Sequence, residues 1–509
     1  MMKALELSGA GLTLQQVGDV ARGGRKVKLA ARALPRLRSS REVVEAALAK
    51  GAPAYGINTG LGRLSDVRIE PDRIRELQVN LVRSHACGLG DPLPPSVVRR
   101  ILLMKANSLA VGCSGIRPEV VDTLLALLNN DVLPVIPSKG SVGASGDLAP
   151  LAHMTLALIG EGEAEHQGKL LEGEAVLRAA GVKPVQLEAK EGLALLNGTQ
   201  VSAALAIEGF FRAETALLSA IAVSALTVEA MAGSYSPFDA RIHAVRNMHG
   251  QITAAELFRS LLTGSEIWQS HQGCDRVQDP YALRCMPQVY GAVWDTLKHA
   301  AGVLERELNS VSDNPLIFGD DVLSGGNVHA EALGFVSDFM AIGATELGNI
   351  AERRIDLLLR KVNPRLPMFL AKDPGLESGF MIAHVTAAAL ASENKTLAHP
   401  ATVDTVPTSA GQEDHVSMAP WAGVKLNLIL DNLFRILAIE ALASAEAIEF
   451  MRPLKTTAGL ETVQAVIRRA VPAGTQDRRL DGDIAKLAEL LDSGRFLDDA
   501  APALTRTLL

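Results

Sequence analysis

Two long stretches without proline constrain this fold more than any other feature. Residues 332–361 keep a nearly unbroken helical pattern that ends before Pro364, and residues 426–451 form another that Pro453 closes. Both are apolar on more than one side, so each needs neighbouring helices to cover it. Hydrophobic residues make up 48% of the chain but aromatic residues only 4%, so Ala, Leu, Val and Ile must build a core that favours helices. The sequence therefore predicts a mainly α protein, a bundle of long helices.

The first part of the chain has a different character. Glycine and proline punctuate short apolar runs throughout residues 1–110, which predicts short helices, loops and a few strands. Helical patterns dominate residues 111–509, and the more charged tail from about residue 477 is typical of a pair of surface helices. We expect a small mixed N-terminal segment, residues 1–110, followed by a helical bundle, residues 111–509.

Charge and cysteine usage narrow the class of protein. The net charge of −7 argues against nucleic acid or an anionic membrane as the main partner. The four cysteines are too few and too widely spaced for a disulfide framework or a zinc site; they are Cys87, Cys113, Cys274 and Cys285. The longest apolar run, residues 215–228, is too short to span a bilayer, and the N-terminus lacks the pattern of a signal peptide. We expect a soluble, cytoplasmic protein.

The tripeptide Ala144-Ser145-Gly146 can make its own electrophile. In a sharply bent backbone the Gly146 nitrogen can attack the Ala144 carbonyl carbon, and loss of water together with the Ser145 hydroxyl leaves a five-membered ring with an exocyclic methylene. Gly146 tolerates the strained backbone, Ser145 supplies the leaving hydroxyl, and Ala144 does not crowd the ring. An ordinary Gly/Ser turn is the simpler interpretation of the tripeptide alone. A nucleophile elbow or a phosphate loop fits less well, because neither consensus is complete here.

The longer run GASGDLAPLAHMTLAL, residues 143–158, resembles the signature of the aromatic amino acid ammonia-lyases, most closely that of the histidine ammonia-lyases. The resemblance implies that Ala144, Ser145 and Gly146 form the prosthetic group 4-methylidene-imidazol-5-one (MIO), with no external cofactor. It also implies the all-helical fold shared with fumarase and aspartase, and a homotetramer whose active sites each draw on several subunits.

Further blocks extend the resemblance over nearly the whole chain. Tyr55 lies in the glycine-rich run AYGINTG, His85 in SHACG and Asn197 in LLNGTQ. Each residue alone is compatible with a structural role in the core or a turn. The resemblance implies that Tyr55 removes the β-proton of the substrate, that His85 contacts its ring, and that Asn197 lies beside MIO and substrate.

A fourth block, residues 277–285 (VQDPYALRC), contains Gln278, Tyr281 and Arg284. A guanidinium offers a planar fork that can hold an α-carboxylate through two hydrogen bonds. Gln278 and Tyr281 can complete the hydrogen bonding around the carboxylate and MIO. A solvated surface arginine is the simpler alternative.

The last two blocks, residues 324–331 and 407–418, are more specific to substrate. In the resembling family, a glutamate at the position of Glu413 accompanies histidine as substrate, because a carboxylate can pair with the imidazole or the amino group. His329 and Glu331 could suggest a metal pair, but two ligands without a third are a weak signal, so we expect no metal. Val328 and Gly411 depart from the expected pattern, and Met286 and His384 lie in matching or adjacent segments; these four residues leave the preferred aromatic substrate open.

The resemblance implies elimination of ammonia from L-histidine to give trans-urocanate, by a carbon–nitrogen lyase that needs no metal, nicotinamide or pyridoxal. A phenylalanine or tyrosine ammonia-lyase, or an MIO aminomutase, shares most of these blocks and remains open. A catalytically inactive helical scaffold is the non-enzyme alternative, against which the intact tripeptide and Tyr55, Asn197, Tyr281 and Arg284 argue.

Overall fold

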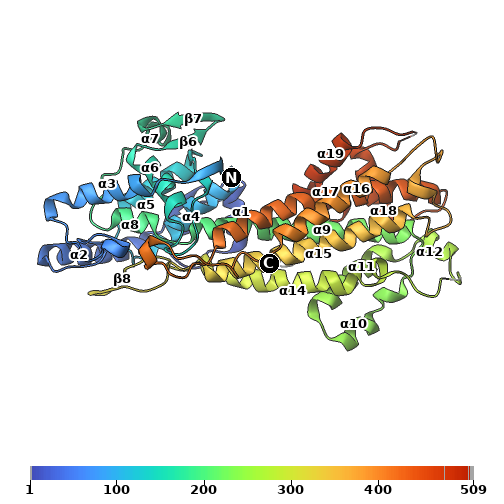
Figure 1. Cartoon of the computed structure of the whole chain (residues 1–509), viewed down its shortest axis with the longest axis horizontal. Helices are drawn as coiled ribbons and strands as arrows, with labels where there is room; N and C mark the ends of the chain where they lie inside the picture. Colours follow the sequence, from blue (N-terminus) through green and yellow to red (C-terminus); the bar gives the residue numbers. More distant parts are fainter. Residues whose placement is uncertain (1–2, 275, 475, 503, 505–509) are drawn as a thin grey trace. The chain divides into compact units, whose positions relative to one another are not determined.

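The computed structural model describes residues 3–274, 276–474, 476–502 and 504 (Figure 1). These residues contain twenty α-helices and nine short strands, which confirms the expected mainly α fold. The chain divides into two compact units, each made of three stretches. Unit 1 comprises residues 1–208, 301–338 and 400–424, and unit 2 comprises residues 209–300, 339–399 and 425–509. The boundary expected near residue 110 coincides with the end of a helix inside unit 1.

Unit 1 mixes helices with all nine strands of the described residues, and six of these strands lie beyond residue 110, outside the segment in which strands were expected. Its helices are α1 (Leu14–Ala21), α2 (Leu34–Lys50), α3 (Ile74–His85), α4 (Pro95–Ala110), α5 (Pro118–Asn129), α6 (Leu148–Ile159), α7 (Glu174–Ala180) and α8 (Glu191–Leu196). Its strands are β1 (Leu5–Leu7), β2 (Val27–Leu29), β3 (Leu89–Pro92), β4 (Leu133–Pro134), β5 (Pro137–Lys139), β6 (Glu163–His166), β7 (Lys169–Glu172), β8 (Leu316–Phe318) and β9 (Asp321–Leu323).

The strands form four small sheets rather than one. β1 pairs with β2 in parallel, whereas β3–β5, β4–β6–β7 and β8–β9 are antiparallel. Sheets of two or three strands contribute little stability on their own, so helices carry most of the core of unit 1. One wall of that core is α4, which is buried along most of its length.

Four long helices contain four of the five points at which the chain is divided into units. They are α9 (Gln200–Ala230), α14 (Met286–Glu307), α15 (Glu331–Leu359) and α17 (Ala419–Met451). The helices predicted over residues 332–361 and 426–451 are confirmed as α15 and α17, although α17 begins earlier than the sequence pattern indicated. Of the helices described, α9 is the one long and apolar enough to cross a membrane, and 89% of its apolar window is buried inside the protein.

The remaining helices belong to unit 2. They are α10 (Ala240–Arg246), α11 (His249–Leu262), α12 (Glu266–Ser270), α13 (Tyr281–Arg284), α16 (Met381–Leu397), α18 (Ala458–Ala470), α19 (Asp481–Asp492) and α20 (Arg495–Ala500). The last two lie in the charged tail that begins at about residue 477. Fully buried Leu, Ile and Ala side chains of α17 form much of the core of this unit, as the aliphatic composition predicted.

Candidate active site

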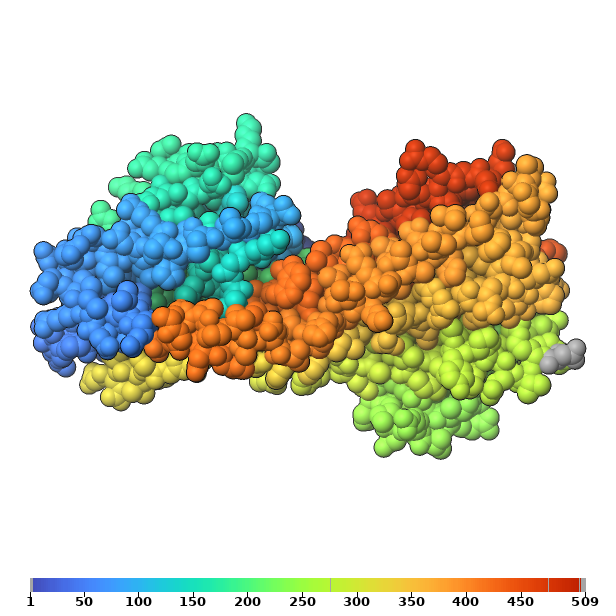
Figure 2. Space-filling view, viewed as in Figure 1, coloured from blue at the N-terminus to red at the C-terminus, as the bar shows by residue number. Residues whose placement is uncertain are grey.

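A cavity of about 680 Å³ lies in unit 1 and is lined by most of the sequence-predicted site residues of that unit. This volume is within the range of small-molecule sites. Figure 2 shows the orange segment 400–424 against the blue N-terminal part of the same unit. The predicted residues in the lining are Tyr55, His85, Ser145, Asn197 and Glu413.

The loop before α6 holds the Ala144-Ser145-Gly146 tripeptide in a bent backbone. Gly143 and Gly146 adopt positive φ angles of +70° and +77°, a region that favours glycine. The Gly143 carbonyl accepts hydrogen bonds from the Ala330 amide at 3.2 Å and the Ser417 hydroxyl at 3.0 Å. The loop is therefore anchored on the segments that contain two of the predicted blocks.

Gly146 packs directly on the backbone of Gly198. A Cβ atom on Gly146 would lie 2.4 Å from the Gly198 carbonyl oxygen, and the Asp147 amide donates to that oxygen at 2.8 Å. Asp147 is fully buried and accepts from the Ser202 amide at 2.7 Å and the Ser202 hydroxyl at 2.8 Å. Any side chain on Gly146 would displace this contact, so the close approach requires glycine.

These observations fit the MIO ring. Gly146, where the backbone must bend, packs against the Gly198 backbone. The small Ala144 side chain is almost completely buried, with 8% of its surface exposed. The Ser145 hydroxyl, which has to leave, lines the cavity and donates a hydrogen bond to Glu413 Oε1. The tripeptide thus has the close packing and the accessible leaving group that ring formation requires.

Glu413 is held as a hydrogen-bond acceptor beside Ser145. Its Oε2 accepts from the Thr408 hydroxyl at 2.6 Å and the Ser409 hydroxyl at 2.8 Å. Partial burial would raise the pKa of Glu413, but the hydrogen bonds from the Ser145, Thr408 and Ser409 hydroxyls outweigh burial and lower it. Glu413 is therefore ionised at neutral pH.

The turn before Glu413 is strained. Ser409 and Ala410 have φ angles of +50° and +54°, and Gly411 continues with +81°. Non-glycine residues in this region cost free energy and cluster at functional sites. Gly411, a departure from the expected sequence, is thus a position where the backbone itself favours glycine.

His85, the last residue of α3, presents a neutral imidazole to the cavity. Its Nδ1 lies 2.8 Å from the Leu81 carbonyl oxygen. Because a carbonyl can only accept, Nδ1 carries the proton and Nε2 remains an acceptor. Burial lowers the pKa of His85, against the opposing effects of the Leu81 hydrogen bond and Glu413. The cavity therefore contains an imidazole acceptor and a carboxylate.

Tyr55 lies in the loop between α2 and the 3₁₀ turn Gly62–Leu64. Its hydroxyl accepts a hydrogen bond from the Gly62 amide at 3.3 Å, and the side chain lines the cavity with Ser145. The glycine-rich sequence around it forms a run of turns, as expected for a loop that places a side chain in a site.

Three predicted residues belong to unit 2 instead. Gln278 is exposed, Tyr281 is 69% exposed, and the Arg284 guanidinium lies over the Tyr281 ring at 4.3 Å from its centroid. Arg284 Nε is buried and has no hydrogen-bond partner among the described residues. The planar donor group of Arg284 is therefore incompletely used within the chain.

Met286 and His384, which lie in or next to the predicted blocks, also belong to unit 2. Met286 is fully buried, and His384 Nε2 contacts Glu352 Oε1 at 2.8 Å. The contact between His384 and Glu352 is internal to unit 2. Val328, by contrast, is in unit 1 and is almost completely buried.

The structure brings His415 to the pair His329 and Glu331. The two imidazole rings stack, and His329 Nδ1 and His415 Nε2 lie 3.8 and 3.9 Å from Glu331 Oε2. Tetrahedral zinc with bonds of about 2.0–2.1 Å would hold its ligand atoms closer together. The ligand atoms of the trio are therefore spaced more widely than in a zinc centre, and its third member was missed because it lies far away in the sequence.

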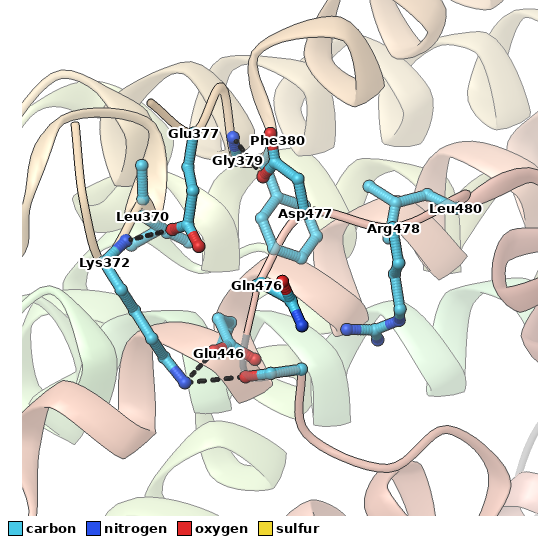
Figure 3. Close-up of a pocket in the computed structure, with 12 residues that line it drawn as sticks. Leu370, Lys372, Glu377, Gly379, Phe380, Glu446, Gln476, Asp477, Arg478 and Leu480 are labelled. Atoms are coloured by element: carbon cyan, nitrogen blue, oxygen red, sulfur yellow. Dashed lines mark hydrogen bonds and ion pairs between the residues drawn. The ribbon is translucent and has the colours of Figure 1, made fainter. Parts of the chain in front are cut away.

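A second, much smaller cavity lies in unit 2 (Figure 3). Its volume is about 40 Å³, little more than ordered water requires. The charged groups around it bind neighbouring backbone atoms: Lys372 Nζ donates to the Gly474 carbonyl at 2.6 Å, and Asp477 accepts from the Gly379 amide at 3.0 Å. These contacts satisfy Lys372 and Asp477 within unit 2, and none of the sequence-predicted site residues lines this cavity.

Sequence reasoning missed several residues of the unit 1 cavity. Leu193 and Leu196 of α8 supply an apolar wall, and Asn80, Ser84 and Arg63 add polar groups. Leu196 directly precedes the predicted Asn197, so its position next to a predicted site residue was the available signal.

The sequence and fold place the chain among known proteins. The profile of the aromatic amino acid lyase family matches residues 12–469. A histidine ammonia-lyase from Rhodospirillum rubrum is 53% identical over 500 residues, covering 97% of each chain. The crystal structure of histidine ammonia-lyase from Trypanosoma cruzi is 40% identical with a TM-score of 0.90, over 98% of this chain and 95% of that one.

Tyrosine aminomutase from Streptomyces globisporus has the same fold, with 36% identity and a TM-score of 0.92 over 98% of this chain and 99% of that one. This chain belongs to the aromatic amino acid lyase family. The family resemblance found in the sequence is confirmed, and so is the fold class.

Proposed function

We propose that this protein is a carbon–nitrogen lyase that eliminates ammonia from L-histidine to give trans-urocanate. The observation that carries the proposal is the cavity in which Glu413 binds the Ser145 hydroxyl, with His85 and Tyr55 in the same lining. An acceptor imidazole and an ionised carboxylate suit an imidazole substrate better than a phenyl ring, which would leave both without partners. The similarity to histidine ammonia-lyases supports the same substrate.

In the proposed reaction, MIO supplies the electrophile and side chains of the protein supply the base and the substrate contacts. MIO, formed from Ala144, Ser145 and Gly146, supplies an electrophile for the substrate amine, which otherwise leaves poorly. Tyr55, as its phenolate, takes the proton from Cβ onto its oxygen, and the electrons of that C–H bond form the new double bond as the Cα–N bond breaks and the amine leaves with the electrons of the Cα–N bond. Conversion of Ser145 also removes the hydroxyl that Glu413 Oε1 accepts from, which frees this oxygen for the substrate.

Assembly completes the site in this proposal. Gln278, Tyr281 and Arg284 are expected to hold the substrate carboxylate and MIO, but they belong to unit 2 and remain largely exposed or unpartnered. Large apolar side chains are also exposed on α15 and α16, including Phe339, Ile342, Ile382 and Val385. Both features support an oligomer in which one subunit supplies these residues to another, and we propose that it is a homotetramer in the cytoplasm.

The alternatives have less support. The solved aminomutase structures share the fold, but at lower identity than the curated histidine ammonia-lyases. Glu413 favours histidine over phenylalanine or tyrosine. An inactive scaffold would have no need to keep Tyr55 and Ser145 in one cavity.

An intact-mass measurement combined with a urocanate assay tests the proposal. The denatured protein should weigh two water molecules less than its sequence, and the native protein should convert L-histidine to trans-urocanate and ammonia. An unmodified mass would remove MIO from the proposal. A modified mass without histidine turnover would retain MIO and reject the substrate.

A further inference from the structure

Both hydrogens of the Asn197 side-chain amide are used behind the cavity wall. Nδ2 donates to Asp313 Oδ1 at 3.1 Å and to the Asn314 carbonyl oxygen at 2.7 Å. An amide group has two N–H donors and one oxygen acceptor. The atom left for the cavity is therefore Asn197 Oδ1, so the side chain presents an acceptor rather than a donor.

Asp313 dictates this orientation because it can only accept. It is 3% exposed, and its Oδ2 forms an ion pair with the fully buried Lys190 Nζ at 2.8 Å. Burial would raise the pKa of Asp313, but Lys190 and Lys105 outweigh burial and lower it. An ionised carboxylate has no proton to donate, so it selects the nitrogen end of the Asn197 amide.

Lys105 holds the backbone of the same residue. This buried lysine of α4 donates from Nζ to the Asn197 carbonyl oxygen. The next residue, Gly198, is the one against which Gly146 packs. The charged cluster of Lys105, Lys190 and Asp313 thus fixes both the side chain of Asn197 and the backbone that leads to the tripeptide.

Burying several charged groups to hold a loop costs free energy, because each charge loses its hydration. Desolvation of an ion pair offsets much of its attraction, and apolar residues of similar size often serve stability equally well. A neutral asparagine at position 313 could accept or donate, which would leave the Asn314 carbonyl to favour the observed orientation of the Asn197 amide without a second obligatory acceptor. The charge of Asp313 thus adds an acceptor that strengthens this orientation.

We propose that Asp313 is a positioning residue: it holds the Asn197 amide with its oxygen toward the cavity, where that oxygen accepts a hydrogen bond from the α-amino group of the substrate. The inference rests on the proposed function, since it assigns a role to a residue of the same site. Lys190 is the countercharge of Asp313, and Lys105 fixes the backbone of Asn197.

A double-mutant cycle between Asp313→Asn and Asn197→Ala tests this coupling. Asp313→Asn should lower kcat by about 10- to 100-fold, the scale of a small misplacement in an active site, with a much smaller change in KM. If Asp313 acts through Asn197, adding Asp313→Asn to Asn197→Ala should lower kcat by no more than about twofold. Multiplicative losses in the double variant would overturn the proposal.

Two further variants separate positioning from folding. Asp338 is also a buried aspartate of unit 1, and it accepts from the Thr402 amide at 2.9 Å and the Thr402 hydroxyl at 2.8 Å. Asp338→Asn, a matched control, should leave kcat within about twofold of wild type. If Asp313→Asn fails to fold, Asp313→Asn/Lys190→Met removes the stranded charge, and it should regain the folded state but not kcat. Full kcat in that folded double variant would reject Asp313 as a positioning residue.

The same measurements distinguish this inference from the proposed function. The cycle is run with whichever of histidine, phenylalanine or tyrosine the wild-type protein deaminates. If wild type prefers another of these substrates, the histidine proposal fails while the coupling of Asp313 to Asn197 is still tested. If wild type forms no MIO and deaminates none of them, the proposed function and this inference both fall.

Discussion

Units 1 and 2 each bury a cluster of charged side chains, but the clusters differ in how their polar atoms are used. In unit 2, Arg354 and Glu440 are fully buried and pair at 2.6 Å. The Tyr290 hydroxyl oxygen accepts a hydrogen bond from Arg354, and the Thr227 hydroxyl donates one to Glu440. In unit 1, Asp313 and its lysines support Asn197, whose side chain lines the cavity. The charged groups of unit 2 bind one another and their buried neighbours, whereas the cluster of unit 1 holds a residue that lines the cavity.

This difference separates residues that stabilise the folded state from residues that support turnover. Changes to the cluster of unit 2 should alter the free energy of unfolding and leave the chemistry of the folded protein intact. Changes around the cavity should alter turnover first. Each prediction below can break or sharpen that distinction.

Ser145→Ala should have the largest effect. Alanine has no hydroxyl to lose, so the ring cannot form and turnover should be abolished, while the melting temperature stays close to that of wild type. Intact mass, steady-state kinetics and thermal unfolding provide the measurements. Substantial activity in a sequence-verified Ser145→Ala protein would contradict the assignment of the tripeptide.

Tyr55→Phe should leave ring formation intact and lower kcat by about 10²–10⁴-fold, the usual contribution of a positioned base. The hydroxyl it removes has one described contact, with the Gly62 amide at 3.3 Å, so the fold should persist. Intact mass confirms the ring, and steady-state kinetics measure the loss. A near-wild-type kcat would exclude Tyr55 as the base.

Glu440→Gln tests whether the buried charges of unit 2 contribute to stability alone. It leaves the Arg354 guanidinium buried without its countercharge, and breaking a buried pair costs about 3–5 kcal/mol. Denaturant unfolding should show a loss of this order, whereas kcat per folded molecule should stay within about twofold of wild type. A large fall in kcat with unchanged stability would show that the cluster of unit 2 is not merely structural.

Lys105→Met should show a smaller, pH-dependent effect on stability. Burial lowers the pKa of Lys105 to about 7 in the folded protein, whereas an unfolded lysine titrates near 10.4. Between these values the unfolded chain binds the proton and the folded chain does not, so stability from this group rises with pH. Below about pH 7 wild type bears the full cost of the buried charge.

The stability gained by Lys105→Met should therefore be largest near pH 6 and shrink toward pH 9. Denaturant unfolding of both proteins at the two pH values measures it, with Lys425→Met, another buried lysine, as the matched control. A difference that does not vary with pH would contradict the lowered pKa of Lys105.

The sequence predicted the parts that depend on local pattern. Long proline-free apolar runs give α15 and α17, because 3.6-residue periodicity is visible in any helix that packs. The tripeptide, Tyr55, His85 and Glu413 were found from motifs, and the structure places them around one cavity although Ser145 and Glu413 are 268 residues apart.

The supporting cluster escaped sequence analysis because its meaning depends on tertiary contacts. Lys105 interrupts the apolar run ILLMKANSLA, which was a signal of a buried lysine, but nothing local indicates that it binds the Asn197 carbonyl. Asp313 resembles an ordinary loop aspartate until Lys190 and Asn197 are placed around it. In the proposed assembly Gln278, Tyr281 and Arg284 reach the site from another subunit, an arrangement that local sequence patterns do not encode.

The most direct test of the central claim is the value of kcat/KM for L-histidine, L-phenylalanine and L-tyrosine in wild type and in Glu413→Gln. The account predicts that wild type prefers histidine and that Glu413→Gln lowers histidine turnover and narrows its advantage over phenylalanine. A neutral amide in place of the ionised carboxylate loses a charged hydrogen bond, worth about 1.5–3 kcal/mol. A wild-type preference for phenylalanine or tyrosine would contradict the proposed substrate.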